Sequence, residues 1–82
     1  MNAKEAADKA IANVEKLYAR VLDCRLEEFA KDGEDWKITL SFIVEEIPDS
    51  GNRLVTKMRR LYKLLTISDN TGEVVKMNSV KA

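Results

Sequence analysis

The feature that most constrains the fold is an alternation of apolar and polar residues between positions 35 and 46, which only Ile43 interrupts. Every second side chain in this stretch is large and apolar. A period of two matches the pleat of a β-strand, so these apolar side chains share one face. That face must be covered by another part of the chain. The side chains that form it are Trp36, Ile38, Leu40, Phe42 and Val44.

The only other large apolar surface in the sequence lies near the N-terminus. Between residues 3 and 22, apolar residues recur at spacings of three and four, which is typical of an amphipathic helix. Asn2 is the expected N-cap, with Glu5 as its capping-box partner. The sequence therefore predicts a helix over about 3–22 that covers the strand. Its apolar stripe comprises Ala7, Ala10, Ile11, Val14, Leu17, Tyr18 and Val21.

The segment between this helix and the alternating strand allows two interpretations. Leu22, Leu26 and Phe29 have helical spacing, which indicates an extension of the helix. Alternatively, the Asp32-Gly33 pair before the strand 35–46 indicates a β-hairpin with a type I′ turn. We favour the hairpin, and so expect a strand over about 24–31.

The second half of the chain reads as another hairpin. Pro48, Asp49 and their neighbours favour a turn that ends the strand 35–46. Two apolar runs then flank a turn rich in Asp, Asn and Gly, which predicts strands over about 54–67 and 73–80. The expected fold class is α+β in a single domain, 1–82. An N-terminal helix packs on one face of a three- to four-stranded antiparallel meander.

The composition argues against catalysis. The chain contains no histidine, and the acidic neighbours of its single cysteine, Cys24, disfavour a reactive thiolate. Asp32, Glu34 and Asp35 lie close together but lack the spacing of a calcium loop. We therefore expect a protein that is not an enzyme, with no cofactor and no metal site.

Charge, hydropathy and edge composition bear on partners and location. Fourteen basic and fourteen acidic residues cancel, so net charge supplies no attraction to nucleic acid or anionic membranes. No apolar run in the sequence approaches the ~20 residues that a membrane span needs, and the N-terminus lacks the pattern of a secretory signal. We therefore expect a cytoplasmic protein. Residues 74–80 of the predicted last strand carry few charges for an edge strand, which favours a weak homodimer or a docked partner strand.

One local imbalance of charge lies in the segment 53–63, which has five basic residues and no acidic one. The simplest interpretation is a solvated face that is partly paired with nearby carboxylates. A protein-binding surface is the leading functional interpretation. A small domain that binds single-stranded nucleic acid, with Tyr62 stacking on a base, is the alternative. The candidate partner-binding residues are Lys57, Arg59, Arg60, Tyr62 and Lys63.

The alternating strand begins near Trp36 and ends at a Pro48-Asp49 turn, and Leu54, a strand containing Tyr62 and a Gly72-Glu73 turn follow in that order. Over about residues 33–75 this order resembles the accessory gas vesicle protein O family. Two departures are that Asp35 stands where that family has glycine, and that 74–80 lacks its Arg-rich, Tyr-containing last strand. The resemblance implies a non-enzymatic accessory protein of gas vesicle assembly that binds other vesicle proteins in the cytoplasm. It supplies no catalytic residue. The positions that carry it are Trp36, Pro48, Asp49, Leu54, Tyr62 and Gly72.

Overall fold

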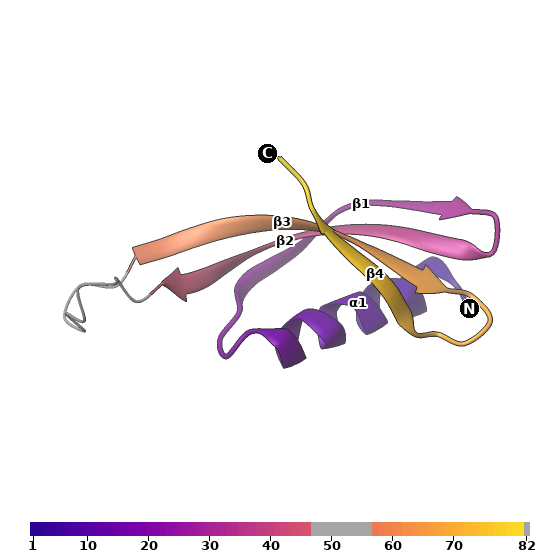
Figure 1. Ribbon diagram of the computed structural model, residues 1–82, viewed down its shortest axis with the longest axis horizontal. Helices are drawn as coiled ribbons and strands as arrows, with labels where there is room; N and C mark the ends of the chain where they lie inside the picture. Colours follow the sequence, from indigo (N-terminus) through magenta and orange to yellow (C-terminus); the bar gives the residue numbers. More distant parts are fainter. Residues whose placement is uncertain (47–56, 82) are drawn as a thin grey trace.

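The computed structural model describes residues 1–46 and 57–81. A single helix lies against one face of a four-stranded antiparallel sheet (Figure 1), which confirms the predicted α+β class. The strands follow one another across the sheet in the order β1-β2-β3-β4, as a meander requires. The elements are α1 (Ala3–Leu17), β1 (Leu22–Asp32), β2 (Asp35–Glu46), β3 (Lys57–Ser68) and β4 (Val74–Ser79).

The helix begins as predicted and ends earlier than predicted. The Asn2 side chain accepts a hydrogen bond of 2.8 Å from the Glu5 backbone N–H, as an N-cap should. At the other end Tyr18 has an extended backbone and closes the last turn through its N–H to the Val14 carbonyl. The predicted extension to residue 22 is therefore wrong, because the chain must already turn there to enter β1.

The buried side of α1 is made of small residues. Ala6, Ala10 and Val14 are completely buried at a spacing of four, and Tyr18 continues this row. Leu17, which the predicted stripe included, lies off the row and is 58% exposed. Alanine at these positions brings the helix backbone close to the sheet, so the core beside it is thin but tightly packed.

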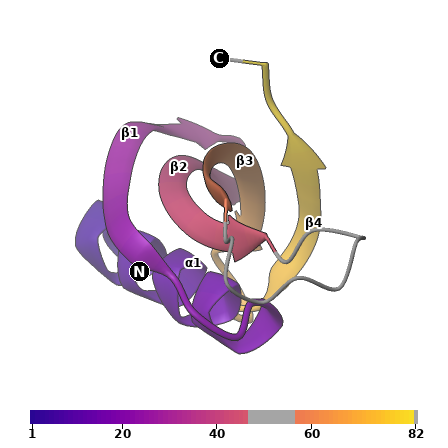
Figure 2. The same ribbon diagram turned by 90° about the vertical axis from the view of Figure 1, so that its left-hand side faces the viewer.

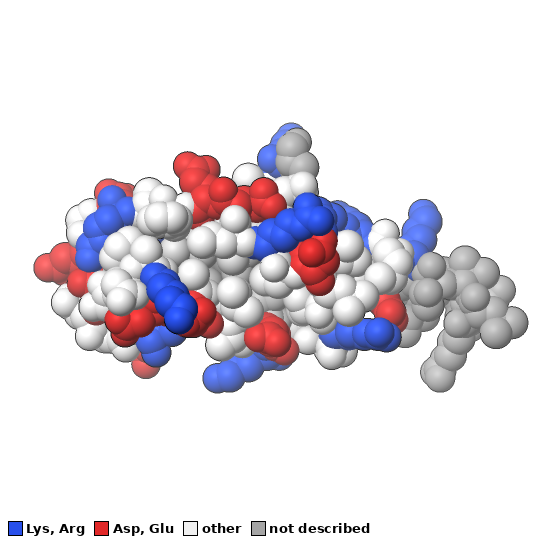
Figure 3. Space-filling model, turned by 180° about the vertical axis from the view of Figure 1, so that it is seen from behind, with Lys and Arg blue, Asp and Glu red and all other residues white. Residues whose placement is uncertain are grey.

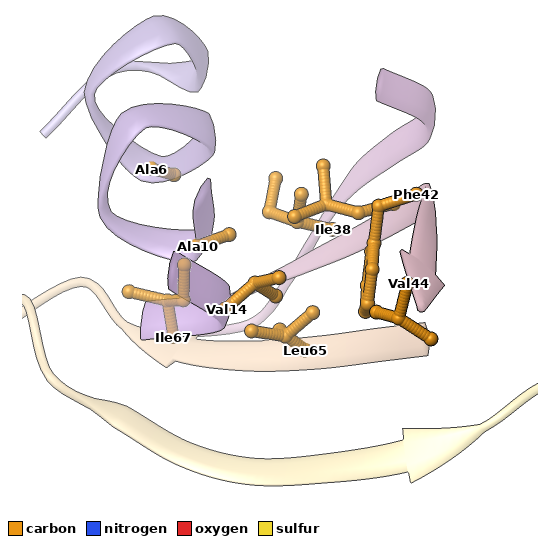
Figure 4. Close-up of a cluster of buried hydrophobic side chains, with 9 residues drawn as sticks. Ala6, Ala10, Val14, Ile38, Phe42, Val44, Leu65 and Ile67 are labelled. Atoms are coloured by element: carbon orange, nitrogen blue, oxygen red, sulfur yellow. The ribbon is translucent and has the colours of Figure 1, made fainter. Parts of the chain in front are cut away.

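The core lies between the helix and the middle of the sheet (Figure 4). The predicted apolar face of β2 is confirmed, with four of its five residues buried and Trp36 partly buried. The ring of Tyr18 lies 5.2 Å from that of Phe42 in a tilted arrangement, at the helix end of the core. The core cluster comprises Ala6, Ala10, Val14, Ile38, Leu40, Phe42, Val44, Leu65 and Ile67.

The segment of ambiguous sequence forms the strand β1, so the hairpin interpretation is confirmed. Asp32 pairs with Asp35 across the two-residue loop. The expected type I′ turn is wrong, because that turn needs a positive φ at both loop residues. Here Gly33 has a φ of +62° and Glu34 does not share it, which is the pattern of a type II′ turn.

β2 and β3 pair without interruption from Asp35 opposite Ser68 to Glu46 opposite Lys57. β4 is shorter and pairs only with the second half of β3. Viewed end-on, β1 and β4 lie on opposite sides of the β2–β3 pair, and the C-terminal end rises away from the sheet (Figure 2). The predicted start of a strand at residue 54 lies outside the described residues, as does the predicted turn around Pro48.

None of the described segments contains a helix that is long and apolar enough to span a bilayer. The expected cytoplasmic location stays a prediction.

Candidate functional site

The five candidate partner-binding residues all lie on β3, but they do not share a face. Lys57, Arg59 and Lys63 alternate with Arg60 and Tyr62, and successive side chains of a strand point to opposite sides. Lys63 is opposite Leu40, which belongs to the face that the helix covers, whereas Tyr62 is opposite Ser41 on the other face. The basic segment is therefore divided by the sheet.

Arg60 belongs to a structural network on the face away from the helix. Its guanidinium donates a hydrogen bond of 2.8 Å to the Ser41 hydroxyl and forms an ion pair with the Asp23 carboxylate. Ser41 is completely buried, and its hydroxyl donates in turn to the Glu27 carboxylate, 2.8 Å away. The network joins β1, β2 and β3, so much of the Arg60 charge is already balanced within the protein.

Asp23 is placed for this role by an irregularity in β1. Its φ is +46°, which aspartate tolerates better than most residues, and it lies where the β1–β2 register shifts. The hydrogen bond from Arg25 is the main cause that lowers the pKa of Asp23; burial opposes it, and the hydrogen bond from Arg60 lowers the pKa further. Asp23 therefore stays ionised and holds Arg60 in place.

A groove opens where β4 separates from β3. It has a volume of about 630 Å³, and four of the five candidate residues line it; Lys57 does not. The Lys63 ammonium group reaches across it to the Ser79 hydroxyl, 2.7 Å away. No described residue with a carboxylate lines it. The lining comprises Arg59, Arg60, Leu61, Tyr62, Lys63, Ser79, Val80 and Lys81.

The uniform sign of charge in this groove differs from other parts of the surface. Seen from behind, acidic and basic side chains are interspersed over the molecule (Figure 3). Exposed charges of mixed sign largely cancel at a distance, whereas a groove whose charged lining residues are all cations retains a local positive field. The groove is therefore a part of the described surface that favours an anionic ligand.

Tyr62 is not a fully exposed aromatic residue on which a nucleic-acid base could readily stack. It is partly buried in the wall of the groove, and its carbonyl accepts a hydrogen bond of 2.9 Å from the Val80 N–H. It is also the only aromatic residue in the described lining. Non-specific binding of a nucleic-acid single strand usually relies on several exposed rings along a basic path. The geometry therefore favours the protein-binding interpretation over the nucleic-acid alternative.

A second polar cluster lies at the opposite end of the sheet, around Asp69. Its carboxylate accepts from the Trp36 indole N–H at 3.0 Å and pairs with the Lys31 ammonium, also at 3.0 Å. These two contacts, the indole hydrogen bond first, lower the pKa of Asp69. The Lys31 ammonium lies 4.8 Å from the centre of the Trp36 ring. Each of these polar groups has a partner within the cluster. The cluster therefore connects the β1–β2 turn to the β3–β4 turn and has a structural role.

The described residues offer little for catalysis. Burial is the main cause that raises the pKa of the Cys24 thiol, and the charge of Glu15 adds to it. Cys24 is therefore protonated at neutral pH, which disfavours nucleophilic attack. Among the described residues no three His, Cys, Asp or Glu side chains are grouped so as to hold a metal ion.

The chain matches no family model, no curated protein and no solved structure. The resemblance to the accessory gas vesicle protein O family therefore stays a prediction. Of the positions that carry it, Pro48, Asp49 and Leu54 lie outside the described residues. Trp36 and Gly72 have structural roles: Gly72 has a φ of +73°, and a Cβ added there would lie 2.9 Å from the Cε of Lys9.

Sequence reasoning located the basic segment but missed two aspects of the site. It did not identify Asp23 as the partner of Arg60, because the two residues are 37 positions apart and no local pattern links them. It also did not anticipate a groove between β3 and β4. One signal was available in the sequence. The predicted strand 73–80 is shorter than the predicted strand 54–67, so part of the longer strand must extend beyond the shorter one.

Proposed function

We propose that this protein is a non-enzymatic protein-interaction module that binds an anionic partner through the groove between β3 and β4. The observation that carries the proposal is the lining of that groove, in which the described charged residues are all cations. Because Arg60 is paired with Asp23, the proposal rests on the local positive charge of Lys63 and Lys81.

Within this class, we keep gas vesicle assembly as the proposed setting, on the strength of the sequence resemblance alone. In that setting the partner is another vesicle protein with an acidic segment. The proposed weak homodimer through β4 is compatible with it, because β4 is a terminal strand of the sheet and its far side is unoccupied by any described strand.

The proposal is tested by capture from an extract of the cells that make the protein. The full chain is compared with the variant Arg59→Glu/Lys63→Glu and with a control, Lys4→Glu/Lys16→Glu, that makes the same charge change on the helix. We expect a protein partner that survives nuclease treatment, is retained by the control and is lost by the groove variant. Identification of that partner as a vesicle component supports the proposed setting.

Two results contradict the proposal. Capture that disappears on nuclease treatment, together with micromolar binding of a single-stranded oligonucleotide, favours the nucleic-acid alternative. The affinity of that complex would fall with salt at a log-log slope of about −3 for roughly four neutralised phosphates. Equal capture by wild type and the groove variant shows that the partner binds elsewhere.

A further inference from the structure

The first half of β3 has one edge that no described strand pairs with. β2 pairs along the whole length of β3, whereas β4 pairs with it only from Lys63 to Ile67. One more bond, from the Val80 N–H to the Tyr62 carbonyl, ends the β3–β4 ladder. Residues 57–61 of β3 therefore lie beyond the end of β4.

The direction of that last hydrogen bond shows which backbone groups face this edge. The Tyr62 carbonyl points toward β4, and in a strand every second residue directs its N–H and C=O to the same side. Arg60 and Met58 therefore present their backbone donors and acceptors to the unpaired edge. Arg59 and Leu61 direct theirs to β2, where they are paired.

Part of the space beside this edge is the groove, which Arg59, Arg60 and Leu61 line on the β3 side. β4 and the residues after it diverge from β3, and Figure 1 shows the C-terminal end turning away while β3 continues. The groove of about 630 Å³ lies in this divergence, between Leu61 and Val80. A strand paired with β3 would lie ~4.8 Å from it, continuing the position that β4 occupies farther along.

The backbone groups that β3 exposes at this edge match a polypeptide better than a nucleic acid. An edge strand offers N–H and C=O groups in alternation, and another extended peptide backbone matches both. A phosphate backbone has acceptors only, so the carbonyls of Met58 and Arg60 would be left without donors. The cations of the groove, among them Lys63 and Lys81, add a preference for acidic side chains.

We propose that the first half of β3 binds an acidic, extended peptide of a partner protein as an added strand along residues 57–61. The added strand forms backbone hydrogen bonds with Met58 and Arg60, and its acidic side chains contact the groove cations. This inference rests on the proposed function and narrows it to one mode of binding. Because the edge is short, we expect a Kd on the order of 10–100 μM for a peptide alone.

The probe is a blocked peptide of about seven residues that alternates Glu and Val, long enough to span 57–61 at ~3.3 Å per residue. It is titrated into the full chain, with amide hydrogen exchange followed by NMR. We expect the Met58 and Arg60 amides to exchange at least about tenfold more slowly with bound peptide. A version N-methylated at alternate residues cannot donate to the edge, and we expect it to bind at least about tenfold more weakly.

Two sets of protein variants sharpen the test. Met58→Pro removes an edge donor without breaking the ladder to β2, and we expect it to bind roughly fivefold more weakly than Met58→Ala, which keeps the N–H. Lys63→Glu/Lys81→Glu should weaken binding, whereas Lys4→Glu/Lys16→Glu on the helix should not. The N-methylated peptide acts on the wild-type chain, so the test survives a Met58→Pro variant that fails to fold.

Equal binding of both peptides, with the Met58 and Arg60 amides still exchanging fast, overturns strand addition. If that binding still depends on Lys63 and Lys81, recognition of an anionic protein survives and only its mode is wrong. If wild type does not bind the acidic peptide at millimolar concentration, the inference fails, and the capture experiment decides the proposed function separately. Oligonucleotide binding tighter than peptide binding overturns both.

Discussion

The two halves of β3 pair with β2 in the same way, but they differ in burial and in whether a second strand pairs with them. The half from Lys63 to Ile67 lies between β2 and β4 and under the helix, and three of its residues are buried. The half from residue 57 to 61 has β2 on one side and no described strand on the other, where its last three residues line the groove, and its residues are exposed or half-buried. One continuous strand thus serves the core at one end and displays an edge at the other.

The difference shows that pairing with one neighbouring strand does not by itself place a segment in the hydrophobic core. The fully buried residues of β3 lie in the half where β4 adds a second neighbour and α1 a cover, whereas Leu61 in the other half is only partly buried against the core. Edge strands that stay unpaired are normally protected by charge, and the first half of β3 contains Lys57, Arg59 and Arg60. We expect these charges to disfavour pairing of the edge with a second copy of itself and to leave it able to accept an acidic strand.

The largest effect is expected from the same substitution made in each half. Leu65→Ala removes a completely buried side chain and should lower the free energy of unfolding by about 3–4 kcal/mol. Leu61→Ala removes a half-buried one and should cost about 1–2 kcal/mol. Urea denaturation measures both. Equal losses would show that the first half of β3 belongs to the core.

A smaller effect concerns the turn that fixes β4 beside the closed half. Gly72→Ala imposes a positive φ of 73° on a residue with a Cβ and displaces the Lys9 side chain, so we expect a loss of about 1.5–2 kcal/mol. Gly33→Ala is the control, because Gly33 has a similar φ and open space around it, and should cost about 1 kcal/mol. A smaller loss for Gly72→Ala than for the control would mean that the contact with Lys9 is unimportant.

Each half is also fastened by one carboxylate whose pKa is lowered, Asp69 at the closed end and Asp23 beside the open half. A pKa lowered by folding stabilises the folded state above the ordinary value of 3.8, and this stabilisation is lost as the pH falls through the lowered value. We expect both carboxyl groups to titrate below pH 3.8 by NMR. In Asp69→Asn and Asp23→Asn, the acid-induced fall in urea midpoint should be shallower than in wild type.

The closed half was largely predictable from sequence, and the open half was not. The period of two in β2 fixes its core face without knowledge of its neighbours, and Asn2 identifies the start of the helix. The end of the helix was missed because the apolar spacing continues beyond Leu17, at Tyr18 and Val21, which pack against the core although they lie past the helix end.

The candidate site depends on relations between distant segments. That Arg59 and Arg60 point to opposite faces follows from their adjacency in a strand, and sequence reasoning could have drawn that conclusion. The partner of Arg60 could not be foreseen, because Asp23 reaches it through a register shift in β1. The open edge arises from where β4 ends relative to β3, which is a property of the assembled sheet.

Amide hydrogen exchange of the free protein tests the central claim most directly. In the first half of β3 we expect alternation, with Arg59 and Leu61 protected by β2 and with Met58 and Arg60 exchanging at least about a hundredfold faster. In the closed half, Leu64 and Thr66 face β4 and should be protected like their neighbours. Equal protection of Met58 and Arg60 with Arg59 and Leu61 would show that the edge is already occupied, and would contradict the account.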